Sequence, residues 1–173
     1  QQSTEWTCGP ASALMVLNYF GMNDKDPVTG QLETDISLAK DRQVKEGQQI
    51  GPTGVTYSAG VVEVFEDMAA DHGQDWITFT HNEMGDLGGG YDYIDSGLIP
   101  YLIANDIPMM IGWDEWGGHW QVIIGYDDMG TPWATQDDVL ILAEPYDTTD
   151  HNQNGYLLES YERLVYGWNT AFE

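Results

Sequence analysis

Residues 6–20 have the sequence WTCGPASALMVLNYF, and they predict a helix that starts beside Cys8. Pro10 fits the first turn of a helix, where a missing N–H group leaves no hydrogen bond unmade, and Gly21 fits the position just past the last turn. The helix is therefore expected to run from Pro10 to about Tyr19. Cys8 is the only cysteine among 173 residues, so it forms no disulfide within the chain.

The position of Cys8 at a helix start bears on its chemistry. Aligned N–H groups at the start of a helix favour an anion and shift a thiol toward the thiolate, which is its reactive form. A lone cysteine is also often a small buried apolar side chain. Position by itself leaves both interpretations open.

Two further residues favour a reactive thiol. Gln2 lies six residues before Cys8, and His119 follows two glycines at the start of an apolar run that predicts a buried strand. The glycines would let a substrate or another backbone approach closely. A thiol nucleophile needs a base, and the base needs a third group to orient it. We interpret His119 as that base, and His72 and His81, which lie in polar surroundings, as surface residues.

These residues carry a resemblance to a known group of enzymes. A glutamine, then CGPAS on a helix, then glycine-histidine on a strand followed by GYDD is similar to papain-like cysteine peptidases. It most resembles the bacteriocin-processing (double-glycine leader) peptidase family and its free-standing relatives. The likeness runs from Gln2 to about Tyr146 and is dense around Cys8 and His119. It implies one papain-like peptidase domain over residues 1–173, of the α+β class, with a helical N-terminal part packed on a C-terminal antiparallel sheet.

The resemblance implies a role for each matching residue. Cys8 corresponds to the nucleophile and His119 to the general base. The side-chain amide of Gln2 and the backbone N–H of Cys8 correspond to the donors of an oxyanion hole, which typically contribute roughly 3–4 kcal/mol each. Members of the family usually carry an aspartate before a proline on the strand after the histidine. Here Glu144 stands in that place, and Asp147 is the alternative orienting acid.

The function that the resemblance implies is hydrolysis of a peptide amide bond through a thioester acyl-enzyme. A transpeptidase similar to phytochelatin synthase is an alternative, because it shares the thioester step. A third interpretation is a non-catalytic module on the same fold that binds calcium or a cationic partner. We expect a peptide or protein substrate, and the sequence leaves the oligomeric state open.

The charge of the chain is strongly negative. Twenty-nine acidic residues face five basic ones, giving a net charge of -24, and no Lys or Arg occurs between Lys45 and Arg163. Such a surface repels nucleic acid and anionic membranes, so neither is an expected partner. No stretch of about twenty apolar residues predicts membrane insertion. We expect a secreted or cell-surface protein, or alternatively a protein from the cytoplasm of a high-salt organism, where salt screens the self-repulsion.

One segment predicts a calcium site. Residues 150–155, DHNQNG, place oxygen ligands at alternate positions before a glycine, as in the first half of an EF-hand loop. The candidate ligands are Asp150, Asn152 and Asn154. The twelfth position is Tyr161, where a bidentate glutamate is expected. The carboxylates that could complete the site instead are those of Asp147, Glu159 and Glu162. A polar turn is the alternative, and the peptidase chemistry requires no cofactor.

The remaining pattern places helices first and strands afterwards, which is typical of the α+β class. Helices are predicted over residues 35–44, within a polar loop over 24–49, and over residues 57–70 and 96–104. Strands are predicted over residues 76–80, 107–113, 120–126, 139–143 and 161–166, and a glycine-rich loop over 85–93. The apolar face of the helix over 57–70 carries Val61, Val64, Phe65 and Met68.

Overall fold

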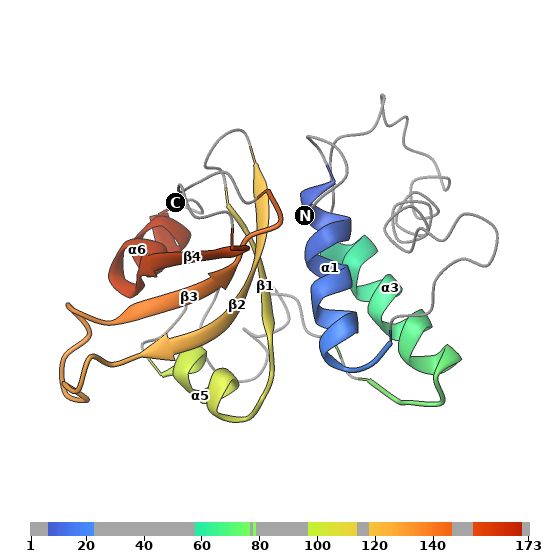
Figure 1. The fold of residues 1–173 in the computed structure, drawn as a ribbon, viewed down its shortest axis with the longest axis horizontal. Helices are drawn as coiled ribbons and strands as arrows, with labels where there is room; N and C mark the ends of the chain where they lie inside the picture. The colour runs from blue at the N-terminus through green and yellow to red at the C-terminus, as the bar shows by residue number, and fades with distance from the viewer. Residues whose placement is uncertain are drawn as a thin grey trace. The chain divides into compact units, whose positions relative to one another are not determined.

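The computed structural model describes residues 7–22, 58–76, 78, 97–113, 118–146 and 154–170 (Figure 1). The chain divides into two compact units, one over residues 2–80 and one within residues 81–173. The described helices of the first unit precede the antiparallel sheet of the second, so the predicted α+β class is confirmed. The single domain over 1–173 stays a prediction. The segments predicted over residues 24–49 and 85–93 lie outside the described residues.

In the first unit, helix α1 (Cys8–Tyr19) confirms the predicted helix and starts at the cysteine itself. Its end has the expected glycine, since Gly21 has a φ of 76°. The N–H groups of Gly21 and Met22 donate to the carbonyls of Asn18 and Leu17, which caps the last turn. Most sides of α1 are apolar, and eight of its twelve residues are buried. A helix of that kind is a core element.

Helix α3 (Ser58–Asp71) confirms the helix predicted over 57–70. Its buried face includes Val61, Val64 and Ala69. The ring of Trp76 lies 4.7 Å from that of Phe20 and 6.1 Å from that of Phe65, so an aromatic cluster joins the end of α1 to α3. Of the strand predicted over 76–80, the two described residues, Trp76 and Thr78, lie in no strand.

The second unit is built on a four-stranded antiparallel sheet in the order β1-β2-β3-β4 (Figure 1). The strands are β1 (Met109–Trp113), β2 (His119–Asp127), β3 (Val139–Ala143) and β4 (Tyr156–Ser160). The first three confirm the strands predicted over 107–113, 120–126 and 139–143. The helix predicted over 96–104 is confirmed as α5 (Leu98–Ala104).

The prediction of a strand over residues 161–166 is wrong. Residues 161–170 form helix α6 (Tyr161–Thr170), and the fourth strand lies just before it. Tyr161 and Leu164, three residues apart, are both buried, which is the spacing of one helix face. The hydroxyl of Ser160 accepts the N–H of Arg163 at 3.4 Å and so caps the first turn.

One face of the sheet forms the core of this unit with α5 and α6 (Figure 1). The buried cluster consists of Ile99, Ile111, Ile123, Leu140, Leu142, Tyr161 and Leu164. Each such side chain contributes about 1.5–3 kcal/mol by leaving water. At the far end of β2 and β3, the Tyr126 hydroxyl donates a hydrogen bond to the buried Asp138. Burial raises the pKa of Tyr126, and that hydrogen bond raises it further.

A membrane-spanning helix would have to be long and apolar, and none of the helices in the described ranges meets both conditions.

Candidate active site

His119 is the first residue of β2, where it pairs with Trp113 of β1. Gly118 precedes it with a φ of 99°, a conformation that L side chains rarely adopt. Among the described residues, no atom lies within 4 Å of where a Cβ of Gly118 would stand. Gly118 is therefore needed for its backbone angle, and the close approach of a substrate or another backbone that the sequence predicted stays a prediction. That angle sets the direction in which the chain enters β2.

His119 forms a short contact with Glu144. The His119 Nε2 atom lies 2.7 Å from Glu144 Oε1, and the two residues are 7% and 1% exposed. The sheet explains why they meet. Val122 of β2 pairs with Ala143 of β3, so Glu144 lies opposite Gln121 and on the face that Gln121 shares with His119.

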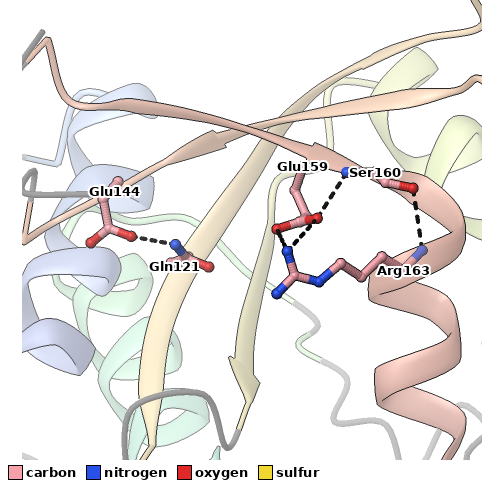
Figure 2. A network of polar contacts seen from close by, with 5 residues as sticks. All are labelled: Gln121, Glu144, Glu159, Ser160 and Arg163. Carbon is pink, nitrogen blue, oxygen red and sulfur yellow. Dashed lines mark hydrogen bonds and ion pairs between the residues drawn. The ribbon is translucent and has the colours of Figure 1, made fainter. Parts of the chain in front are cut away.

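The Glu144 carboxylate accepts hydrogen bonds from three directions. Besides His119, the Gln121 side-chain amide donates to Oε2 (Figure 2), and the N–H of Tyr146 donates to Oε1 at 2.7 Å. Burial by itself raises the pKa of Glu144, but the hydrogen bonds from His119, Gln121 and Tyr146 outweigh it and hold the pKa below its usual value. Glu144 is thus an anion at neutral pH, held against one ring nitrogen of His119.

This geometry has a chemical consequence for the imidazole. An ionised carboxylate against Nε2 favours a proton on that nitrogen and fixes the plane of the ring. The nitrogen that can exchange a proton with a reactant is then Nδ1. The N–H of Glu144 also donates to the carbonyl of Gly155 at 2.9 Å, which holds the backbone behind the carboxylate. The carboxylate of Glu144 can therefore orient the His119 ring and stabilise its protonated form, as a general base requires.

Cys8 is the first residue of α1, in the other unit. The N–H of Ala11 donates to the carbonyl of Thr7 at 2.9 Å and closes the first turn around the cysteine. Cys8 is 8% exposed, and Gly9 and Pro10 beside it are also buried. The backbone N–H of Cys8 lies in the first turn of α1, at the positive end of the helix dipole. A helix start favours an anion, whereas burial in apolar surroundings disfavours one.

The remaining predicted site residues are placed as follows. Gln2 and Asp147 lie outside the described residues. Of the two candidate orienting acids, Glu144 is therefore the one whose contact with His119 can be described. His72 belongs to the same unit as Cys8, and its Nδ1 lies 2.8 Å from the carbonyl of Met68 at the end of α3.

The predicted calcium segment is described only in part. Asp150 and Asn152 lie outside the described residues, and the side-chain oxygen of Asn154 accepts the N–H of Tyr156 at 3.1 Å. The Glu159 carboxylate accepts the N–H of Ser160 and lies 3.5 Å from Arg163 (Figure 2). Within the described ranges, no three His, Cys, Asp or Glu side chains are grouped so that they could hold a metal ion.

Gln121 is the site residue that sequence reasoning missed. The available signal was an amide side chain inside an apolar strand, HWQVIIG. A buried polar group in such a run requires a hydrogen-bonding partner, so it marks a polar contact somewhere on that face. The sequence could not say which residue the partner is.

A cysteine at a helix start and a buried histidine–carboxylate pair on an antiparallel sheet are the features of a papain-like cysteine peptidase. Comparison with known families matches residues 1–170 of the chain to the Peptidase_C39 like family, and the chain belongs to this family. The resemblance inferred from the motifs is therefore confirmed. No curated protein and no solved structure gives a significant match.

Proposed function

We propose that this chain is a cysteine peptidase that hydrolyses a peptide amide bond through a thioester on Cys8. His119 acts as the general base, Glu144 orients it, and Gln2 supplies a donor to the oxyanion. The observation that carries the proposal is the buried contact of 2.7 Å between His119 Nε2 and Glu144 Oε1. A histidine held in this way has one ring nitrogen bound to the carboxylate, and its other ring nitrogen can transfer a proton.

The reaction balances with these groups. His119 Nδ1 takes the thiol proton of Cys8, and the thiolate sulfur attacks the carbonyl carbon of the substrate. The C–N bond breaks as His119 returns the proton to the leaving amine, and a thioester remains. A water molecule, deprotonated by His119, then attacks the thioester carbon. The acid product leaves and the thiol is restored.

Charge develops on the carbonyl oxygen in both tetrahedral intermediates. The backbone N–H of Cys8 and the side-chain amide of Gln2 are the donors assigned to it. Removing one such donor typically lowers the rate by 100- to 1,000-fold. The negative carboxylate of Glu144 stabilises the imidazolium that forms while the oxyanion exists.

The test is the alkylation rate of Cys8 by iodoacetamide as a function of pH. Cys8 is expected to react faster than cysteine in solution below neutral pH, and His119→Ala is expected to remove that acceleration. His72→Ala is the matched control, because His72 follows the end of α3 and its Nδ1 lies 2.8 Å from the carbonyl of Met68, and it should leave the profile unchanged. If Cys8 reacts no faster than cysteine in solution and His119→Ala changes nothing, the catalytic proposal is wrong.

The fate of the acyl group distinguishes hydrolysis from transfer. Incubation with a peptide mixture and an added amine, analysed by mass spectrometry, should give products ending in a carboxylate. Products that carry the added amine instead of water would favour the transpeptidase.

A further inference from the structure

Gln121 is a completely buried polar residue in β2, two positions after His119 and on the same face of the sheet. Its Nε2 group donates to Glu144 Oε2 (Figure 2). His119 and the N–H of Tyr146 contact the other oxygen, Oε1. The two oxygens of the carboxylate are thus held by different groups. A carboxylate held at both oxygens cannot rotate about its last bond without losing a contact.

The oxygen of the Gln121 side-chain amide, unlike its nitrogen, is poorly hydrogen-bonded. Its Oε1 atom is buried and has no hydrogen-bond partner in the part of the chain that the structure describes. A buried carbonyl without a partner lowers stability, and an apolar side chain of similar volume would avoid that cost. The hydrogen bond that the same side chain donates to Glu144 offsets this cost, so the glutamine contributes little net stability. What the glutamine supplies, and a leucine cannot, is a hydrogen bond to the carboxylate.

We propose that Gln121 is a positioning residue that holds the Glu144 carboxylate in the orientation that presents Oε1 to His119. The role rests on the proposed function, because it acts through the base of that reaction. Glutamate has one more rotatable bond than the aspartate usual in similar proteins, so it has more orientations to restrict. Rotation of the Gln121 amide would turn its oxygen toward the carboxylate, so the charge on Glu144 in turn fixes the amide.

The test compares Gln121→Leu with Ile123→Val in the full chain. Gln121→Leu should change the melting temperature little, because losing the hydrogen bond to the buried carboxylate is offset by removing a buried oxygen that has no partner among the described residues. Its kcat should fall by about 10- to 100-fold with little change in KM, the size common for residues that orient a functional group. The acidic limb of the pH–rate profile should move to higher pH, since leucine no longer stabilises the carboxylate.

Ile123→Val is the matched control on the same face of β2. It removes one methyl group from the buried core, so it should lower the melting temperature and leave kcat and the acidic limb unchanged. If Gln121→Leu keeps the wild-type kcat and acidic limb, or behaves as Ile123→Val does, the positioning role is wrong.

A second measurement does not depend on turnover. The carboxyl carbon of Glu144 can be followed by NMR as the pH is lowered and identified by comparison with Glu144→Gln. Gln121→Leu should raise the pKa of Glu144, and equal pKa values in the two proteins would overturn the positioning role. A wild-type protein that never acylates, together with a raised pKa in Gln121→Leu, would instead contradict the proposed function alone.

Discussion

Glu144→Gln removes the charge of the orienting group while keeping its shape. The new amide oxygen can accept from His119 and from the N–H of Tyr146, as Glu144 Oε1 does now. The new NH₂ group would face Gln121. The Gln121 Oε1 atom, which has no partner within the described ranges, can accept from it once the amide rotates. Every group that contacts Glu144 except the Gln121 NH₂ keeps a partner.

The expected losses of rate and stability follow from the replacement of a charged hydrogen-bond acceptor by a neutral one. A hydrogen bond to a charged group is worth about 1.5–3 kcal/mol and a neutral one about 0.5–1.5 kcal/mol, so each contact weakens by about 1–1.5 kcal/mol. The contact with His119 strengthens as the imidazolium forms, and losing that much there slows acylation by about tenfold. Over three contacts this loss is about 3–4.5 kcal/mol, but a neutral amide costs less to bury than a carboxylate, so stability should fall by only about 1–2 kcal/mol. Glu144→Ala leaves three donors without this acceptor and should cost about 3–5 kcal/mol.

The assay is alkylation of Cys8 at a series of pH values, with urea unfolding of each variant beside it. Asp147→Asn is the matched control, since Asp147 is the other candidate for the orienting acid. We expect slower alkylation in Glu144→Gln and an unchanged rate in Asp147→Asn. The opposite pattern would refute the reasoning, and would mean that the contact between Glu144 and His119 serves only the fold.

Three further predictions concern the same residues and the calcium segment. The pKa of Glu144 is lower when folded, so its contribution to stability is full above the usual value of 4.5 and is lost as the pH falls through the folded value. The difference in unfolding free energy between wild type and Glu144→Gln should therefore shrink below pH 4.5; a difference that grows there would contradict this assignment. Gly118→Ala should cost roughly 1–2 kcal/mol in urea unfolding and slow alkylation of Cys8, because the left-handed backbone that leads into His119 is strained in alanine; wild-type values in both would show that this angle is not required. Calorimetric titration with calcium should release or absorb heat and raise the melting temperature in wild type but not in Asp150→Asn, and neither effect in wild type would remove the calcium hypothesis.

The elements that were predicted correctly have local signals at their ends. Helix α1 is bounded by Pro10 and Gly21, which act within one turn, and the three confirmed strands are apolar runs with turn residues around them. The segment over 161–166 has no comparable signal that marks it as a helix or as a strand. Its aromatic and branched residues fit a strand or a helix equally, and the burial of Tyr161 with Leu164 decided for the helix.

The candidate site divides in the same way, into residues that could be predicted from the sequence and a contact that could not. Cys8 and His119 stand in motifs that can be read along the chain, whereas the contact between His119 and Glu144 could not be found there. The contact between His119 and Glu144 depends on which residue of β3 lies opposite β2, and a shift of one position in that register would turn Glu144 to the other face. Nothing near Glu144 in sequence encodes that register.

The sequence alone determined the family, the α+β order of helices and strands, and the candidate nucleophile and base. These follow from residue types and spacings that act over a few positions. Only the tertiary structure decided that Glu144 contacts His119, that Gln121 holds Glu144, and that residues 161–170 are a helix. Hydrogen bonds across strands and burial on a shared core join residues far apart in the chain, so their outcome is fixed by the packed fold and not by any local pattern.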